Sequence, residues 1–530
     1  MLPLILIILD GWGMAKPNRG NAITLAKTPF IDSLFETYPH TQIFAHGSHV
    51  GLPPLQDGNS EAGHMNMGAG RIIEQEAVRI NTTIKNGLFF KNSALLKAIN
   101  HAKRNKSYLH IMGLASGEMS PHSNPKHLKA LIKLIKQENF KNYYLHLFTD
   151  GRDSSPRGGL KFISDIEKDL LKKTKRISTI MGRYYGMDRK KKWENTELAY
   201  NALVLGEGLL ATNPQNAIKE SYSKNITDEF IEPYIITDKK KMLPRIDNND
   251  AVIFFNLRSD RARQLTKCFA ETDFTKKNPG SFKKKKTLKN ICFVALTDFG
   301  PDLDTVKTAF PGAEIEDTLP LVLKKYSQLY VAEKEKYAHV TYFFNGGYNK
   351  PLNGEKWEFV PSPNKKHYDE VPEMSSKKLT KIILNNFKHK AFKLTPQKNS
   401  GFWHYDLTVI NFAAPDMIGH TGNLKAGITC CEAIDRYIKE IVNAYLKADG
   451  TIVITADHGN IEEMINLKTG EIDTKHSTNL VPFIIINKNL KNRIKLKKNG
   501  KLGDIAPTII HLLGEKKPKS MTGVTLIEKI

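Results

Sequence analysis

The chain has 530 residues, of which 40% are hydrophobic and 25% are charged, and its formal net charge is +24. These values are ordinary for a soluble globular enzyme of about two to four domains. Neither fixed-period repeats nor long low-complexity segments occur, which excludes solenoids and disordered scaffolds.

The basic excess is spread along the chain. One dense tract, residues 276–289, contains four consecutive lysines at 283–286 beside a proline and a glycine, and we interpret it as a solvated loop. No zinc finger, RNA-recognition signature or helix-turn-helix pattern accompanies it. We therefore expect neither nucleic acid nor membrane as a partner, and the basicity favours a small anionic substrate.

The first predicted element is a central strand at residues 2–9, directly before Asp10. It lacks a positively charged leader and a small-residue cleavage site and is too short to span a bilayer, so we do not interpret it as a signal peptide.

The four cysteines have neither zinc-ribbon spacing nor the density of a disulfide scaffold, which indicates a reducing cytoplasm. They are Cys268, Cys292, Cys430 and Cys431.

Strand and helix patterns alternate along the rest of the chain, which is typical of α/β proteins with mostly parallel sheets. Further strands are predicted at residues 108–114, 143–148, 251–256, 290–296, 340–344, 407–412, 451–455 and 481–486. Helices are expected to fill most of the gaps between them.

Three of the predicted strands end at residues that bind metal ions. LPLILIILDGWG reaches Asp10, LTVINFAAPDMIGH reaches Asp416 and His420, and TIVITADHGN reaches Asp457 and His458. Parallel α/β sheets build their sites at the carboxyl ends of strands, so these side chains can converge. Mixed carboxylate and imidazole ligands suit manganese, zinc, cobalt or iron better than calcium.

A candidate nucleophile, Ser60, lies in the segment GNSEAGHMNMGAGR. If a helix opens just after it, its hydroxyl and the neighbouring N–H groups face an anion at the helix N-terminus. Coordination to a divalent metal would lower the pKa of the hydroxyl and activate it. The alternative is that Ser60 is only a helix N-cap.

The ligand-bearing strands lie near the N-terminus and beyond residue 400, so the metal-binding domain is predicted to be discontinuous. We assign residues 1–74 and 312–530 to it and residues 75–311 to an inserted second α/β domain. The crossings near residues 72–76 and 310–312 are candidate hinges of two domains that open and close around a substrate.

Nine motifs occur in the order seen in one family. They are ILDGWG, GNSEAGHMNMGAGR, TDGRDSSP, GRYYGMDR, NLRSDRA, EKYAHVTYFFNGG, NFAAPDMIGHTG, ITADHGN and KHSTN. Together they resemble the cofactor-independent (2,3-bisphosphoglycerate-independent) phosphoglycerate mutases of the alkaline phosphatase superfamily, from residue 4 to about residue 525. The resemblance implies an isomerase of glycolysis and gluconeogenesis with an alkaline-phosphatase-like discontinuous domain.

The resemblance also implies two divalent metal ions, most often manganese. Asp416, His420 and His476 would bind one of them, and Asp10, Ser60, Asp457 and His458 the other. His476, in KHSTN, is found through the motif alone, because by itself it reads as a surface histidine. Lys336, in EKYAHVT, is similar to the family lysine that contacts the metal-bound serine and the phosphoryl group.

In the inserted domain the resemblance implies a substrate-binding site. Arg183, Arg189, Arg258 and Arg261 would hold the phosphate and the carboxylate, because the planar guanidinium fork donates two parallel hydrogen bonds to an oxyanion. The glycerate would also meet Arg152, Asp153 and His122, with Asp153 shuttling protons. The chain departs from the family pattern beside His122, where Pro121 precedes it and Asn124 replaces a second histidine.

The implied reaction is a two-step phosphoryl transfer through a phosphoserine on Ser60, from 3-phosphoglycerate to 2-phosphoglycerate, in a cytoplasmic monomer. Two alternatives remain. A different metal-dependent phosphatase or phosphomutase on the same core would not explain the arginines of the inserted domain. A noncatalytic nucleic-acid binder would leave the ligand-bearing strands unexplained.

Overall fold

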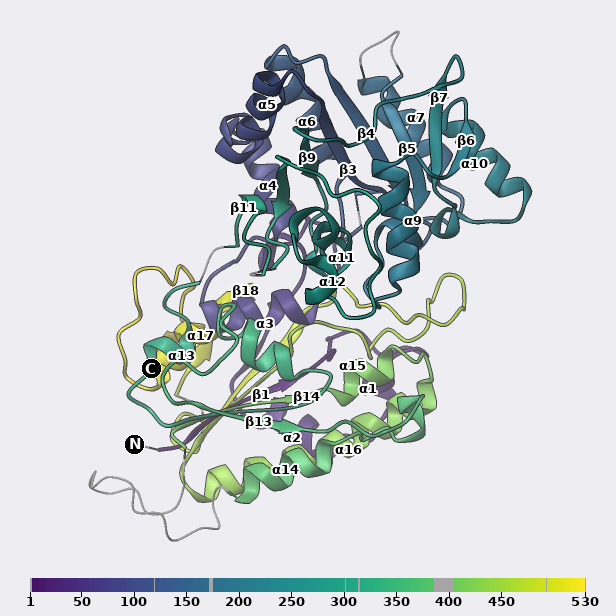
Figure 1. Cartoon of the computed structure of the whole chain (residues 1–530). Coiled ribbons are helices and arrows are strands. Elements are labelled where there is room, and N and C mark those ends of the chain that lie inside the picture. Colours follow the sequence, from purple (N-terminus) through teal and green to yellow (C-terminus); the bar gives the residue numbers. More distant parts are fainter. Residues whose placement is uncertain are drawn as a thin grey trace. The chain divides into compact units, whose positions relative to one another are not determined.

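The computed structural model describes residues 2–118, 120–170, 175–300, 302–312, 315–385, 405–491 and 493–529. The chain divides into two compact units (Figure 1). The discontinuous unit comprises Met1–Gln75 and Glu314–Ile530, and the inserted unit comprises Glu76–Ala313. Each unit is built around its own mixed, mostly parallel sheet, so the predicted α/β architecture is confirmed.

The sheet of the discontinuous unit has eight strands. In spatial order they are β13 (Lys356–Val360), β12 (Gln328–Glu333), β14 (Leu407–Phe412), β1 (Leu4–Leu9), β15 (Thr451–Thr455), β16 (Val481–Ile486), β2 (His40–Phe44) and β18 (Gly500–Lys501). The five strands from β13 to β15 are parallel, whereas β16 is antiparallel to both of its neighbours. A separate pair joins β17 (Lys495–Leu496) to β19 (Ile527–Lys529).

Strand β1 lies at the centre of the sheet, with all six of its residues buried. Its continuous apolar run, LILIIL, is typical of a parallel strand that is covered on both faces. In the register, Leu9 pairs with Phe412 of β14, and Ile8 pairs with Thr455 of β15. The three strands therefore end at the same level, and the residues that follow them meet at one edge.

Helices cover both faces of this sheet; α14 and α16 lie along one face, and α3 and α17 along the other (Figure 1). The helices of the unit are α1 (Ala22–Leu25), α2 (Pro29–Thr37), α3 (Ser60–Ala69), α13 (Leu319–Val322), α14 (Ser376–Asn385), α15 (Ala414–Gly419), α16 (Leu424–Lys447) and α17 (Ile505–Leu512). No helix among the described residues combines the length and apolarity of a membrane span.

The sheet of the inserted unit has nine strands. Eight of them follow the order β11 (Lys307–Phe310), β10 (Cys292–Thr297), β9 (Ala251–Phe254), β3 (Leu109–Ala115), β4 (Tyr143–Thr149), β5 (Ile177–Gly182), β7 (Tyr234–Asp238) and β6 (Leu209–Ala211), and β8 (Lys241–Met242) pairs with β7. The run from β11 to β5 is parallel.

Alternating residues of these strands enter two different cores, one on each face of the sheet. On β3, Ile111 belongs to one core and Met112 to the other. The surrounding helices are α4 (Glu76–Lys85), α5 (Ser93–Asn105), α6 (Pro125–Gln137), α7 (Gly159–Asp169), α8 (Arg183–Gly186), α9 (Trp193–Val204), α10 (Pro214–Ser223), α11 (Ser259–Ala270) and α12 (Phe274–Lys277).

The predicted strand at residues 340–344 is wrong. His339–Phe343 form a short helical turn instead, η4, in which the N–H of Phe344 donates to the carbonyl oxygen of His339 at 3.0 Å. The β-branched and aromatic side chains resemble those of a strand, but β propensity depends on which surface they pack against. Here the segment packs against α3, so closely that a Cβ on Gly68 would lie 1.8 Å from the oxygen of Phe344.

The remaining predicted strands exist: those at residues 407–412, 451–455 and 481–486 have the predicted ends, and the ends of the others shift by at most two residues. The strand predicted at residues 290–296 begins at Cys292, because Asn290 has a left-handed backbone (φ 53°) that a strand does not accommodate.

The lysine tract at residues 276–289 is less free than a solvated loop. Lys285 pairs with Glu207 at 2.7 Å and Lys286 with Asp247 at 2.7 Å. The half-buried Lys284 donates to the carbonyl oxygens of Cys268 and Glu271, beside the C-terminal end of α11.

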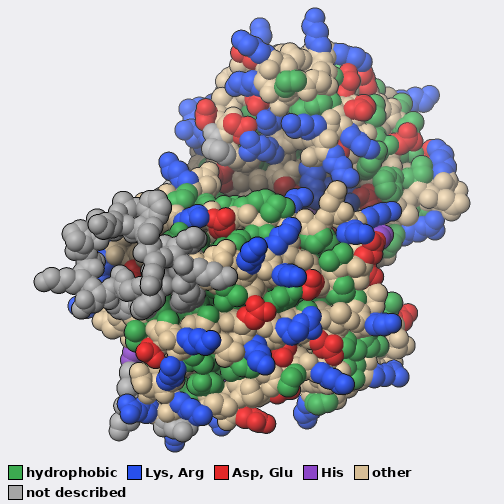
Figure 2. All heavy atoms as spheres, turned by 90° about the horizontal axis from the view of Figure 1, so that it is seen from below, with side chains coloured by type: hydrophobic (Ala, Val, Ile, Leu, Met, Phe, Trp, Pro, Cys, Tyr) green, Lys and Arg blue, Asp and Glu red, His purple; other side chains and the backbone are tan. Residues whose placement is uncertain are grey.

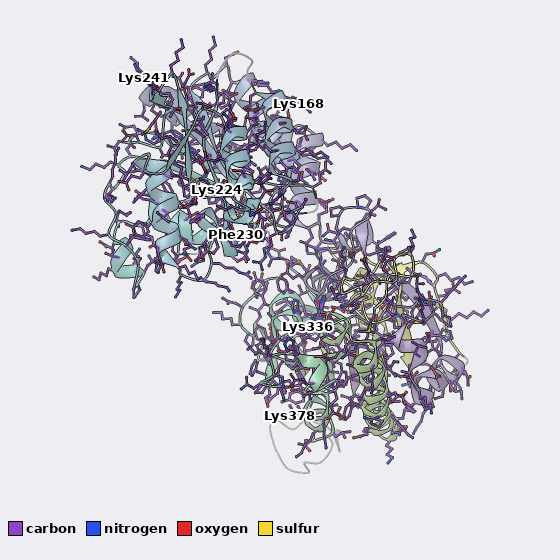
Figure 3. The ribbon with its side chains drawn as sticks, turned by 90° about the vertical axis from the view of Figure 1, so that its right-hand side faces the viewer. Lys168, Lys224, Phe230, Lys241, Lys336 and Lys378 are labelled. Carbon is purple, nitrogen blue, oxygen red and sulfur yellow. The ribbon has the colours of Figure 1, made fainter. Side chains whose placement is uncertain are left out.

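Elsewhere basic side chains are dispersed. Figure 2 shows them scattered among acidic and hydrophobic side chains on one face. Lys168, Lys224 and Lys241 are spread over the inserted unit (Figure 3).

Candidate functional site

Three aspartates meet where β1, β14 and β15 end. Asp10 directly follows β1, Asp457 lies two residues beyond β15, and Asp416 lies in α15, which begins two residues after β14. All three are buried. A helical turn follows β14, and it brings Nε2 of His420 to 3.3 Å from Oδ1 of Asp416.

Ser60 is the first residue of α3, and it is not the N-cap. Asn59 takes that role, because its side chain accepts a hydrogen bond from the N–H of Ala62. The hydroxyl of Ser60 is therefore free to face the carboxylates, and its Oγ lies 2.9 Å from Nε2 of His458 and 3.3 Å from Oδ1 of Asp10.

Lys336 supplies the cationic side chain of this group. Its Nζ lies 2.7 Å from Oγ of Ser60 and 2.6 Å from carboxylate oxygens of both Asp10 and Asp416. Burial opposes its charge, but the carboxylates of Asp10 and Asp416 outweigh that effect and raise the pKa of Lys336. Figure 3 shows Lys336 within the discontinuous unit, in contrast to the solvent-exposed Lys378.

Three histidines have a common arrangement around the carboxylates. Each directs Nδ1 at a backbone carbonyl oxygen, which assigns a proton to Nδ1, so that Nε2 carries the lone pair in the neutral ring. The pairs are His420 with Thr474 at 2.8 Å, His458 with Gly459 at 3.3 Å and His476 with Gly58 at 2.8 Å.

The Nε2 atoms of His420 and His476 lie 3.1 Å apart, and that of His476 lies 3.3 Å from Oδ1 of Asp416. Burial opposes their charge, but the carboxylate of Asp416 raises the pKa of both imidazoles. In the neutral rings, the two Nε2 atoms and the carboxylate form a donor set that suits a metal cation. Burial lowers the pKa of His458 to about 4, so this ring is neutral and can also act as a ligand.

The charges of the cluster also fit divalent cations. Burial and the neighbouring Asp457 raise the pKa of Asp10 to about 7, which indicates too little compensating positive charge around it. Buried carboxylates are stable when they are paired or coordinate metals. Two sets of ligand atoms lie close enough for an ion each. They are Asp416, His458 and His476, and Asp10, His64 and Asp457.

The predicted division of the ligands between two ions differs in part from these sets, because His458 was assigned to the ion of Asp10 and Asp457 but here groups with Asp416 and His476. His458 is close to both, since its Nε2 lies 3.5 Å from Oδ2 of Asp457 and its ring stacks on that of His476. Within the described residues, all seven predicted metal ligands gather in one cluster of the discontinuous unit, together with Lys336.

Two residues of the cluster, His64 and Asn411, were not predicted from the sequence. Nδ1 of His64 lies 2.9 Å from the carbonyl oxygen of Ser60, and Nδ2 of Asn411 lies 3.0 Å from its Nε2. Asn411 also donates to Oδ2 of Asp10 at 2.7 Å. Both nitrogens of His64 thus have partners that orient its ring, and its Nδ1 also lies 3.3 Å from Oδ2 of Asp457. The available signals were the spacing of four from Ser60 and a polar residue inside the buried strand β14.

In the inserted unit a second cluster forms around Arg183, which is buried at the carboxyl end of β5. Its Nη1 lies 2.5 Å from Oδ1 of Asp150 and 2.6 Å from Oδ2 of Asp153. Nε2 of His122 lies 3.8 Å from the same Asp153 oxygen. Burial, and next the charge of Arg183, lower the pKa of His122 to about 4. Asp150, which also accepts a hydrogen bond from Ser116, was not predicted.

The other predicted arginines lie around this cluster. Arg189 bonds to Asp260 at 2.5 Å, and Nε of Arg258 lies 3.7 Å from the same carboxylate. Burial lowers the pKa of Arg261, and the charges of Arg183, Arg189 and Arg152 lower it further. These arginines are therefore close enough to repel one another, which favours the binding of an anion.

The altered residue beside His122 has a structural role. The side chain of Asn124 accepts from the N–H of Lys126 at 3.0 Å and caps α6, whose first residue is Pro125. The carbonyl oxygen of His122 accepts from the N–H of Leu257 at 2.8 Å, which links this loop to the segment that carries Arg258.

Comparisons with known proteins agree with this arrangement. The family described as BPG-independent PGAM N-terminus (iPGM_N) matches residues 80–300. The 2,3-bisphosphoglycerate-independent phosphoglycerate mutase of Clostridium kluyveri is 44% identical over 529 residues, covering 99% of each chain. That of Clostridium perfringens is 43% identical over 530 residues, again covering 99% of each. A crystal structure of the Leishmania mexicana phosphoglycerate mutase at low cobalt concentration is 28% identical, covers 100% of this chain and 98% of that one, and has a TM-score of 0.71.

Proposed function

The chain belongs to the 2,3-bisphosphoglycerate-independent phosphoglycerate mutase family, and we propose that it works through a phosphoserine on Ser60. As an isomerase of this family it interconverts 3-phosphoglycerate and 2-phosphoglycerate without 2,3-bisphosphoglycerate. The observation that carries the proposal is the position of Oγ of Ser60, within 3.3 Å of Lys336, His458 and Asp10. A buried hydroxyl among these groups is prepared for ionisation.

Two divalent metal ions, with manganese as the first choice, are the proposed cofactors. Asp416, His420 and His476 would hold one, and Asp10, Ser60, Asp457 and His458 the other. When bound, such ions lower the pKa of a coordinated hydroxyl and neutralise phosphoryl oxygens. The mixed donor set and the inward-facing Nε2 atoms support this assignment, as does the cobalt named for the Leishmania mexicana relative.

The residues of the discontinuous unit account for the transfer itself. Oγ of Ser60 attacks the phosphorus of 3-phosphoglycerate and releases glycerate, and the 2-hydroxyl of the reoriented glycerate then takes the phosphoryl group back. Lys336 stabilises the serine oxygen and the charge on the equatorial phosphoryl oxygens, which is most of what phosphoryl transfer requires of a protein.

The inserted unit is proposed to bind and orient the substrate. Its arginines would hold the phosphate and carboxylate, and Asp153 would exchange protons with the glycerate hydroxyls. The contact of Asp153 with Arg183 supports this role, because it fixes the position of the carboxylate within the cluster. The residues in these roles are His122, Arg152, Asp153, Arg183, Arg189, Arg258 and Arg261.

We also propose a division of roles between the two domains, an oligomeric state and a compartment. We assign metal binding to residues 1–74 and 312–530 and substrate binding to residues 75–311. A monomer in the cytoplasm is proposed, and the four unpaired, buried cysteines support a reducing compartment. Light scattering of the purified protein tests the monomer.

The deciding experiment is conversion of 3-phosphoglycerate without added 2,3-bisphosphoglycerate, with manganese supplied. Activity in the natural protein and its loss in Ser60→Ala are expected, with a phosphoserine at residue 60 detected by mass spectrometry. Inactivity of the manganese-loaded protein, or full activity of Ser60→Ala, would contradict the proposal. A panel of other phosphate esters separates a mutase from a phosphatase on the same core.

A further inference from the structure

Glu462 is a fully buried carboxylate that lies four residues after His458 and has no role in the proposed reaction. We propose that it is a positioning residue for metal binding, because it joins the three loops that carry Asp10, the pair Asp457 and His458, and His476. The inference rests on the proposed metal sites and adds a residue that determines how well they form.

Both oxygens of Glu462 are used in these links. Oε2 accepts from the backbone N–H of Gly13 at 2.9 Å and of Asn460 at 2.8 Å. Oε1 accepts from the hydroxyl of Ser477 and from Nδ2 of Asn479, the latter at 3.0 Å. Four donors from three loops therefore converge on one side chain, and each donor lies one to three residues from a proposed ligand.

Two glycines beside Glu462 lie so close to its carboxylate that neither position has room for a side chain. A Cβ on Gly13 would lie 2.1 Å from Oε1 of Glu462, and a Cβ on Gly459 would lie 2.3 Å from the same oxygen. Any larger residue at either position would displace the carboxylate. The two loops thus approach Glu462 closely because each has a glycine at the point of contact.

Backbone hydrogen bonds join the same loops next to Glu462. The N–H of Ile461 donates to the oxygen of Gly11 at 3.0 Å, and the N–H of Ser477 donates to the oxygen of Gly459 at 2.9 Å. Glu462 occupies the junction of these links, so its loss would loosen the loops relative to one another. Residues that orient ligands in this way typically change metal affinity by about 10- to 100-fold.

Charge and position can be separated by substitution. Glu462→Asp keeps the negative charge near the metals but is one carbon too short to reach all four donors. Glu462→Gln keeps the length but replaces an acceptor with an amide that opposes the donors. If Glu462 acts only through its charge, Glu462→Asp retains metal affinity; if it acts by position, both variants lose affinity.

The test is calorimetric titration of manganese into the metal-free protein and its variants. We expect the Kd of Glu462→Asp and Glu462→Gln to rise by about 10- to 100-fold. At saturating manganese, the KM for 3-phosphoglycerate is expected to stay unchanged, because the substrate arginines lie in the inserted unit. Asp435→Asn is the matched control, since Asp435 is buried in the same unit and accepts from the N–H of Ile31 at 2.7 Å, away from the ligand loops.

Each outcome has a defined meaning. If Glu462→Asp binds manganese as tightly as the natural protein does, the inference is overturned and the proposed function stays intact. If the natural protein binds no manganese, both are overturned. If circular dichroism shows that the Glu462 variants do not fold, Ser477→Ala decides, because it removes one link only. Weaker manganese binding by Ser477→Ala then supports the inference, and unchanged binding contradicts it.

Discussion

The ammonium nitrogen of Lys336 lies 2.7 Å from the hydroxyl oxygen of Ser60, although 276 residues separate them in the sequence. Lys336 follows β12 after a tight turn, and Ser60 opens α3, which packs on η4 just beyond Lys336. The contact that α3 makes with η4 therefore keeps the cation beside the nucleophile.

Replacement of this lysine tests that relationship. Lys336→Met is expected to lower kcat by about 100- to 1,000-fold, the usual loss when one preorganised donor is removed from a transition state. Steady-state assays without 2,3-bisphosphoglycerate measure the effect. Lys378→Met, at an exposed lysine of the same unit, is the control and should behave like the natural protein. A loss of less than threefold in Lys336→Met would refute the assigned role.

Chelation should reduce both activity and stability. EDTA is expected to lower Tm, because the buried carboxylates lose their compensating cations. Manganese at 100 times its Kd should then raise the free energy of unfolding by about 2.7 kcal/mol. Zinc or cobalt should restore stability better than calcium, because imidazole ligands suit them. Differential scanning calorimetry measures this effect, and an identical Tm in EDTA and in manganese would contradict the metal sites.

The inserted unit is tested at Arg261. Arg261→Ala removes a guanidinium whose pKa is already lowered by burial and by its arginine neighbours, and KM for 3-phosphoglycerate should rise by about 10- to 100-fold, the equivalent of one charged hydrogen bond. Arg263→Ala, on the same helix, is the control, because Arg263 pairs with Asp302. Equal effects of the two substitutions would argue against a substrate role for Arg261.

Glu333 makes stability depend on pH. It is buried at the end of β12, and burial raises its pKa from 4.5 to about 7. The folded state therefore holds a proton that the unfolded state releases, so this contribution to stability is present below pH 4.5 and is lost as the pH rises towards 7. Glu333→Gln removes the titration.

At pH 8, Glu333→Gln should unfold with a free energy larger by about 3 kcal/mol than that of the natural protein, and near pH 5 the two should differ little. Urea denaturation at both pH values measures this difference. An equal difference in unfolding free energy at both pH values would mean that packing, rather than ionisation of Glu333, causes the difference.

Local patterns predicted much of the site. Asp10, Asp416 and Asp457 were found because each follows a continuous apolar run, and the carboxyl ends of parallel strands meet at one edge. His476 and Lys336 required the family resemblance, because neither lies next to a strand pattern with a ligand signal. The strand predicted at residues 340–344 failed because its composition suits either state, and the contact with α3 decided for a helical turn.

Hydrophobic periodicity and residue type were enough to predict the alternation of strands and helices, the discontinuous arrangement of the ligand-bearing segments and most of the candidate ligands. Which polar groups support these residues depends on how the chain folds. His64, Asn411 and Glu462 act through partners up to 449 residues away, as in the bond from Gly13 to Glu462. Such pairings depend on which loops meet after folding, and no local preference encodes that contact.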